Sequence, residues 1–142
     1  YEYRISLEKN VFLSDTALQL MQADLDVEKM NAAARLLLKY EDFKCFSRSK
    51  TDVKTYLCDI SEAFWKREGK ELIFRISANR FLRNMVRAVV GTLLEVGKDK
   101  MSIPEFEEVI KSRDRTRAGA SVKAKGLFLT KVDYPDELFK VS

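Results

Sequence analysis

The chain begins with an alternation of apolar and polar positions. Over residues 1–8 every second side chain is apolar, which predicts a strand with one buried face. These apolar positions are Tyr1, Tyr3, Ile5 and Leu7. Residues 9–24 are expected to connect this strand to a helix. That helix has Asp26 as its N-cap and carries apolar residues at helical spacing to about Lys39.

A second alternating stretch predicts a β-hairpin that ends near residue 78. The side chains expected on the buried face are Tyr56, Cys58 and Ile60 in the first strand and Leu72, Phe74, Ile76 and Ala78 in the second. The turn is expected at Gly69, because glycine adopts a positive φ without strain.

Helical spacing returns over residues 79–97, which predicts a helix capped by Asn79 and stopped by Gly97. The capping-box spacing of residues 102–105 predicts a shorter helix to about Lys111. A final strand is expected from residue 126. The order strand, helix, strand, strand, helix, strand predicts one α+β domain of the ferredoxin-like, split βαβ type. In this fold an antiparallel sheet has its helices packed on one face, which leaves the other face free.

The helix expected over residues 79–97 has an unusual charge distribution. Arg80, Arg83 and Arg87 would lie within about 60° of one another around its axis. Cations near a helix N-terminus oppose its dipole, at a cost of roughly 0.3–1 kcal/mol each when exposed. Three arginines without an acidic neighbour suit recognition of carboxylate or phosphate, and a solvated polar face is the alternative. Gly91, near the axis of this face, would let another group approach the backbone closely.

Residues 111–125 concentrate positive charge. The segment carries six basic side chains and one acidic side chain, so its net charge of +5 exceeds the +4 of the whole chain. Clustered lysine and arginine fit contacts with phosphodiester groups, and a flexible solvated loop is the alternative. A weaker basic stretch, residues 44–54, lies among aromatic residues, of which Phe43 and Phe46 are expected in the core.

The composition excludes several kinds of chemistry. The 142 residues contain no histidine, which excludes Ser-His-Asp and Cys-His catalysis within this chain and leaves little to bind a metal. No zinc or haem site is therefore expected. Cys45 and Cys58 are expected to be reduced and partly buried, as in a cytoplasmic protein. No apolar run approaches the roughly 18 residues of a membrane span, so no membrane association is expected.

Two strings of residues resemble the C-terminal half of the TruA family of tRNA pseudouridine synthases. They are ANRFLRNMVRAVVGTLLEVG, residues 78–97, and DRTRAGASVKAKGLFLTKVDYP, residues 114–135. YEDFKCFS, residues 40–47, and YEYRI, residues 1–5, resemble further segments of that family. The resemblance implies an enzyme that isomerises uridine to pseudouridine in the anticodon arm of tRNA. It also implies a homodimer that needs neither cofactor nor metal.

The resemblance implies roles for individual residues. Arg87 matches the basic residue that pairs with the family's catalytic aspartate. Tyr1 matches the tyrosine that stacks on the target base, with Tyr3 as the alternative if the register differs by two, and Leu127 matches the apolar residue beside that base. The other cations are expected to contact RNA phosphates: Arg80, Arg83, Arg113, Arg115, Arg117, Lys123 and Lys125.

The family's catalytic aspartate lies in a Gly-Arg-Thr-Asp-x-Gly-Val-His-Ala motif, which these residues do not contain. The chain also begins at Tyr1, without methionine and inside a strand pattern. We therefore expect the C-terminal half of a longer enzyme, inactive by itself. The alternatives are a freestanding RNA-binding module without catalysis and a structural domain that dimerises through its open sheet face.

Overall fold

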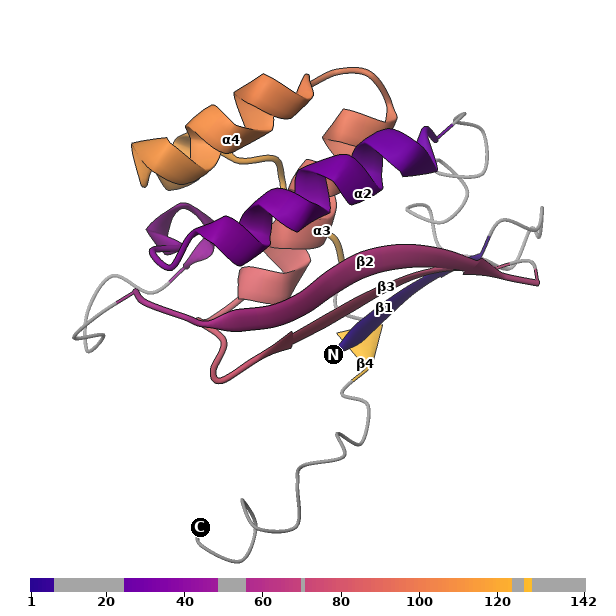
Figure 1. Ribbon diagram of the computed structural model, residues 1–142, viewed down its shortest axis with the longest axis horizontal. Coiled ribbons are helices and arrows are strands. Elements are labelled where there is room, and N and C mark those ends of the chain that lie inside the picture. The colour runs from indigo at the N-terminus through magenta and orange to yellow at the C-terminus, as the bar shows by residue number, and fades with distance from the viewer. Residues whose placement is uncertain (7–24, 49–55, 70, 124–126, 129–142) are drawn as a thin grey trace, which may run out of the picture.

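The computed structural model describes residues 1–6, 25–48, 56–69, 71–123 and 127–128, and it confirms the α+β, ferredoxin-like architecture (Figure 1). The strands are β1 (Glu2–Ser6), β2 (Ile60–Glu68), β3 (Glu71–Ala78) and β4 (Leu127–Phe128). They form one sheet in the order β2-β3-β1-β4, in which all neighbouring strands are antiparallel. The helices α2 (Val27–Leu36), α3 (Met85–Gly97) and α4 (Ile103–Ser112) lie on one side of it.

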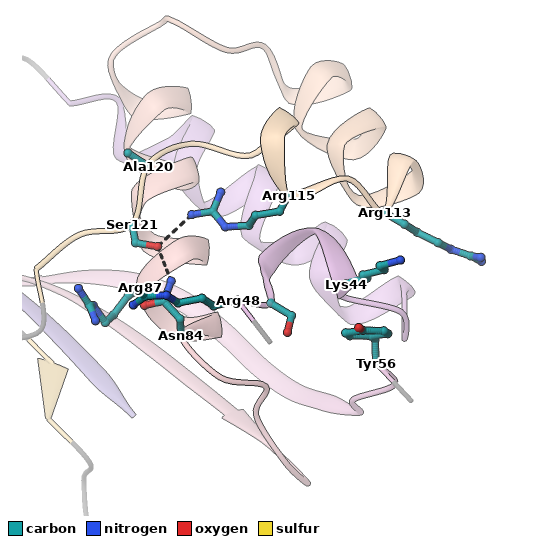
Figure 2. Close-up of a pocket in the computed structure, with 10 residues that line it drawn as sticks. Lys44, Arg48, Tyr56, Asn84, Arg87, Arg113, Arg115, Ala120 and Ser121 are labelled. Atoms are coloured by element: carbon teal, nitrogen blue, oxygen red, sulfur yellow. Dashed lines mark hydrogen bonds between the residues drawn. The ribbon is translucent and has the colours of Figure 1, made fainter. Parts of the chain in front are cut away.

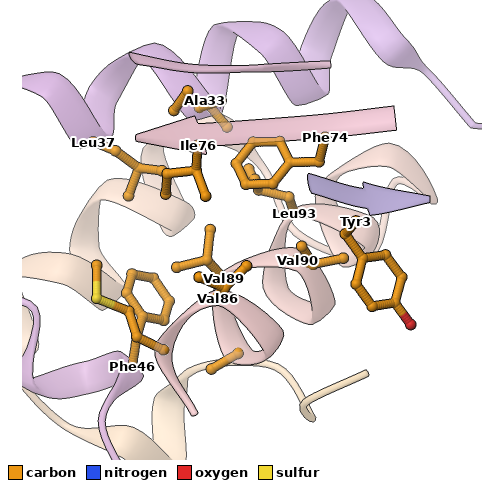
Figure 3. Packing of buried hydrophobic residues seen from close by; sticks show 14 of the residues in the cluster. Tyr3, Ala33, Leu37, Phe46, Phe74, Ile76, Val86, Val89, Val90 and Leu93 are labelled. Atoms are coloured by element: carbon orange, nitrogen blue, oxygen red, sulfur yellow. The ribbon is translucent and has the colours of Figure 1, made fainter. Parts of the chain in front are cut away.

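Helix α3 is the central element of the core. Its valines and leucines pack toward the side chains of Phe74, Ile76 and Tyr3 from the sheet (Figure 3). Every residue of α3 is buried except Arg87 and Glu95, which are half-buried. A helix that is apolar nearly all round belongs inside a protein, where packing rather than charge decides its position. Arg87 is therefore a lone cation on an otherwise buried helix.

The prediction that this helix begins at Asn79 is wrong. Helix α3 starts at Met85, and its N-cap is Asn84 in the left-handed conformation, with φ of 66°. The Oδ1 atom of Asn79 accepts a hydrogen bond from the Asp59 N–H at 2.7 Å, and the Asn79 N–H donates to the Asp59 carbonyl at 3.1 Å. Asn79 thus closes the end of the hairpin instead of opening a helix.

The later start moves two arginines off the helix. Arg80 and Arg83 lie on the segment between β3 and α3, so the prediction that they share a helical face with Arg87 is wrong. The segment bends because the Met85 N–H donates to the Leu82 carbonyl at 3.0 Å. Gly97, predicted to follow the helix, is its last residue.

The first strand of the hairpin is shorter than predicted. β2 begins at Ile60, because residues 56–58 pair with residues 41–43 instead of with β3. The predicted turn at Gly69 is confirmed, with φ of 59°. The predicted N-cap of α2 at Asp26 is also confirmed, since its side chain accepts a hydrogen bond from the Lys29 N–H.

The short helix also follows its prediction. The capping box of α4 is complete, because Ser102 and Glu105 each accept a hydrogen bond from the backbone of the other. Three short 3₁₀ helices complete the described elements: η1 (Leu37–Lys39), η2 (Lys44–Phe46) and η3 (Arg115–Arg117). The connector predicted over 9–24, the last residues of the first strand and the final strand beyond Phe128 lie outside the described residues.

One side chain of α2 covers part of the free edge of β2. Asn31 accepts a hydrogen bond from the Trp65 N–H at 2.6 Å through Oδ1, and its Nδ2 donates to the Trp65 carbonyl at 3.1 Å. A strand edge otherwise presents such groups to any other strand. Both backbone groups of Trp65 are therefore satisfied within the domain.

The two cysteines are free thiols, as predicted, and both are fully rather than partly buried. Burial raises the pKa of the Cys45 thiol to about 12, so this group stays protonated at neutral pH. Within the part of the chain that the structure describes, no helix is both long and apolar enough to cross a membrane.

Candidate functional site

Two adjoining hollows lie at the beginning of α3. The first, which we call the tyrosine hollow, has a volume of about 370 Å³, and Tyr1 and Phe81 are among the residues that line it. The second, the arginine hollow, has a volume of about 730 Å³ and is shown in Figure 2. Arg48, Asn84 and Arg87 line both hollows, so a ligand that fills one also meets residues of the other.

Among the described residues, Val122 accepts the hydrogen bond that orients the Arg87 side chain. The Nε atom of Arg87 donates to the Val122 carbonyl at 2.8 Å, while the Val122 N–H donates to the Arg87 carbonyl at 3.1 Å. No carboxylate of the described residues forms an ion pair with Arg87. The guanidinium is thus oriented by a neutral acceptor and keeps its full charge for an anion.

The segment that holds Arg87 is docked closely against α3. A Cβ atom at Gly91 would overlap the carbonyl oxygen of Ala120, so only glycine allows the two backbones to come this near. Thr92 Oγ1 accepts a hydrogen bond from the Gly119 N–H at 2.9 Å, which fixes the same segment at the next residue of the helix. The close approach expected at Gly91 is confirmed, and the chain's own segment makes it.

Ser121 connects the start of the helix to the basic segment (Figure 2). Its Oγ atom accepts hydrogen bonds from Asn84 Nδ2 at 2.6 Å and from Arg115 Nη2 at 3.0 Å. Arg115 also donates through Nη1 to the Gly119 carbonyl at 3.0 Å. The described part of the basic segment is therefore linked by these hydrogen bonds to the start of α3.

Tyr1 and Tyr3 point to the same face of β1 but have different surroundings. Tyr1 is half-buried, and its ring packs edge-on against Phe81 with the ring centroids 5.2 Å apart. Tyr3 is only 4% exposed, and its hydroxyl donates to the Lys123 carbonyl at 2.9 Å. Burial raises the pKa of Tyr3, an effect that the nearby Arg87 opposes. Of the two, Tyr1 is the tyrosine that lines the tyrosine hollow.

The remaining predicted residues are only partly brought together. Arg83 lines the tyrosine hollow, and Arg113 and Arg115 line the arginine hollow. Arg113 is partly neutralised, because its Nε lies 3.3 Å from Asp42 Oδ2. Arg80, Arg117 and Lys123 are exposed and line neither hollow. The backbone of Leu127 pairs with Tyr3 in β4, whereas its side chain and the whole of Lys125 lie outside what the structure describes.

The polar residues that sequence reasoning did not assign to the site include Asn84, Ser121, Lys44 and Arg48, the last of which lines both hollows. Asn84 carried a usable signal, because asparagine is a preferred N-cap and tolerates positive φ. Its Oδ1 is buried without a hydrogen-bond partner among the described residues. Lys44 lies 5.5 Å from the centre of the Tyr56 ring, and it belongs to the weaker basic stretch. Ser121 lies in a string that resembles the family, but the resemblance gave it no role, and its position comes from contacts between distant segments.

The sequence profile of the family described as tRNA pseudouridine synthase matches residues 33–135, a range that includes Asn84, Arg87 and Ser121. This chain belongs to that family. Similar proteins include the tRNA pseudouridine synthase A of Parabacteroides distasonis, 48% identical over 141 residues, and that of Bacteroides thetaiotaomicron, 47% identical over 142 residues. These alignments cover 99% and 98% of the chain but 56% and 52% of the relatives. The chain therefore spans about half the length of the curated relatives it matches.

Relatives of lower identity carry the same description. The tRNA pseudouridine synthase A of Bacillus licheniformis is 41% identical over 111 residues, which are 78% of this chain and 45% of that relative. In this member of the tRNA pseudouridine synthase family, none of the described residues that line the two hollows is acidic. The described part of the site can therefore bind and orient an anion, but it supplies no carboxylate for acid–base or nucleophilic chemistry.

Proposed function

We propose that this chain is the C-terminal half of an enzyme that isomerises uridine to pseudouridine in the anticodon arm of tRNA. Membership of the tRNA pseudouridine synthase family supports the proposal, as does the coverage of about half of each relative named above. In the reaction, the bond from ribose C1′ to base N1 breaks and a bond from C1′ to C5 forms. N1 ends with a proton and C5 loses one, so no oxidant or reductant is needed.

The main observation behind the proposal is that Tyr1 and Arg87 line the same hollow. None of the described residues that line it is acidic. A nucleotide taken out of the RNA stack would place its base against the Tyr1 ring, as aromatic side chains commonly do with unpaired bases. The catalytic aspartate would come from a segment outside this chain and pair with the terminal nitrogens of Arg87. That ion pair would keep the carboxylate ionised and fix its direction.

The proposal assigns supporting roles to other residues. Leu127 would pack beside the base, since its backbone lies next to Tyr3 in the sheet. The other predicted cations would contact RNA phosphates, where most of the binding free energy comes from release of counterions. Without the aspartate the 142 residues would bind RNA but not convert uridine.

The oligomeric state and the cellular compartment of the enzyme are also part of the proposal. Resemblance to the TruA family supports a homodimer, which sedimentation of the full-length protein would test. Two buried free thiols fit a reducing compartment such as the cytoplasm.

Tritium release tests the activity directly. When tRNA labelled with tritium at C5 of uridine is incubated with the full-length protein, tritium should pass to water as C5 joins the ribose. Replacing the aspartate of the Gly-Arg-Thr-Asp motif with asparagine should stop the release while tRNA binding remains. Binding without release by the unaltered protein would contradict the proposal and favour the RNA-binding module without catalysis.

A further inference from the structure

The arginine hollow has a charge composition that the Tyr1–Arg87 pair does not explain. Five of its lining residues are cations, and none of its described lining residues is acidic. The cations are Lys44, Arg48, Arg87, Arg113 and Arg115. Like charges gathered around a concave surface repel one another and raise its potential, which an anion entering the hollow would relieve.

Arg115 is the most firmly placed of these cations. Two of its nitrogens are bound by the Gly119 carbonyl and by Ser121 Oγ, and Figure 2 shows its side chain pointing from η3 toward Ser121. Both acceptors are neutral, so the positive charge is not cancelled. An arginine that is already ordered loses little conformational freedom when it binds an anion, which favours affinity.

Ser121 itself has a hydrogen to donate. Its Oγ atom already accepts hydrogen bonds from Asn84 and Arg115, so the hydroxyl proton is left to point elsewhere. On the far side of the hollow, the Lys44 ammonium lies over the Tyr56 ring, a cation–π contact that holds it at the rim. Figure 2 shows Lys44 and Tyr56 on one side and Ser121 on the other, with Arg115 between them.

From this arrangement we infer that the arginine hollow binds a phosphodiester group of the RNA strand, next to the nucleotide held in the tyrosine hollow. The inference rests on the proposed function and extends it to a subsite made by Lys44, Arg115 and Ser121. Continuity supports it, because Arg48, Asn84 and Arg87 line both hollows. A single strand that places one base against Tyr1 carries its neighbouring phosphate across this shared wall.

The test compares two forms of the full-length protein that differ in the subsite alone. The double variant Lys44→Gln, Arg115→Gln removes two cations that line the arginine hollow and not the tyrosine hollow. We expect tRNA binding to weaken about five- to twentyfold near 0.1 M salt, with the slope of log K against log salt reduced by about 0.7 for each cation removed from the phosphate. The matched control is Lys100→Gln, which removes an exposed cation that lines neither hollow and should change neither quantity.

A modified RNA identifies the phosphate. Neutral methylphosphonates are placed one at a time within three nucleotides of the target uridine. One of them should weaken binding to the unaltered protein severalfold and have almost no further effect on the double variant. Equal losses for both proteins at every position would overturn the inference, as would an unchanged salt slope in the double variant.

Two controls separate the causes of failure. If the unaltered protein releases no tritium from labelled tRNA, the proposed function fails; if it does so while the subsite tests are negative, only the subsite fails. Because Arg115 also makes structural hydrogen bonds, Lys44→Gln is tested alone. This exposed side chain makes no ion pair among the described residues, and its loss should still lower the slope by about 0.7.

Discussion

Two arginines on the open face of the sheet and two at the hollows are fixed by different kinds of partner, whereas Arg113, at the arginine hollow, pairs with Asp42. On the sheet, Arg4 and Arg75 lie near carboxylates, with the buried Glu2 common to both at 3.0 and 3.9 Å. At the hollows, Arg87 and Arg115 are bound by backbone carbonyls and a hydroxyl. Both environments order the side chain, but only the first neutralises it.

The difference separates stability from function. A carboxylate partner makes an arginine part of the folded structure, because removing the arginine leaves a carboxylate such as Glu2 with one partner fewer. A neutral partner positions the guanidinium without satisfying its charge, so the positive charge remains available to a ligand. We therefore expect substitutions on the sheet to lower stability and substitutions at the hollows to lower activity or RNA affinity.

Arg87→Ala should give the largest effect on activity. In the full-length protein we expect turnover to fall by about 10³-fold or more, since the aspartate loses the cation that orients it. Affinity for tRNA should change by less than about fivefold, because the cations assigned to RNA phosphates are unaltered. Single-turnover rates and filter-binding measurements give the two quantities separately.

Arg4→Ala provides the contrast on the sheet. It should lower the free energy of unfolding slightly, since Glu2 and Glu71 lose hydrogen bonds, and leave turnover unchanged. Unchanged turnover in Arg87→Ala would remove Arg87 from the active site. Equal effects of the two substitutions on turnover would remove the contrast between the two regions.

Gly91→Ala should affect both properties. The new methyl group would overlap the Ala120 carbonyl, so the segment that holds Arg87 through Val122 must shift. We expect a loss of about 1–3 kcal/mol in urea unfolding and a fall in turnover larger than the loss of tRNA affinity. Gly69→Ala is the matched control, because it is strained only by its positive φ in the hairpin turn. Normal turnover in a folded Gly91→Ala protein would contradict this positioning.

Neutralising the basic segment should have a smaller and different effect. With Arg113, Arg115 and Arg117 all changed to glutamine, the slope of log K against log salt should fall by up to about two. Arg113 should contribute least, because Asp42 already pairs with it. Titrations of tRNA binding at salt concentrations between about 50 and 200 mM measure the slope. Lys66→Gln, which removes a cation paired with Glu68 on the sheet, should leave it unchanged.

The smallest effect concerns the interior, where Cys45 is buried. Its folded pKa of about 12 lies above the ordinary value of 9.0, so below pH 9 the thiol is protonated in both states. Between pH 9 and about 12 the unfolded chain loses this proton first, and stability decreases. Urea unfolding at pH 8 and pH 10 should show a decrease of about 1 kcal/mol that is absent in Cys45→Ala. An equal decrease in both proteins would assign it to other groups.

The sequence predicted elements well where burial alone determines them. Tyr3, Ile5, Phe74 and Ile76 lie on the faces that their alternation indicated, because a strand's period is a local property. The start of α3 was missed because Asn79 and Asn84 are both good N-cap residues. The choice depends on a hydrogen bond from Asp59, which is 20 residues away in the chain.

The residues of the candidate site also fall into those that the sequence predicted and those that it did not. Tyr1 and Arg87 were found because they match a family string, and the structure brings them to one hollow. Lys44 and Ser121 were missed although both lie in strings that resemble the family, because the resemblance assigned a role to neither. Their roles arise only when η2 and the segment around Ser121 pack beside α3.

The side-chain amide of Asn31 restricts the edge at which another strand could extend the sheet. With both backbone groups of Trp65 occupied, a further strand would have to break those bonds to extend the sheet beyond β2. At the opposite end of the strand order, beside β4, none of the described side chains is seen to occupy the backbone groups in this way. Among the described residues, Asn31 therefore protects the β2 edge of the sheet against pairing with another strand.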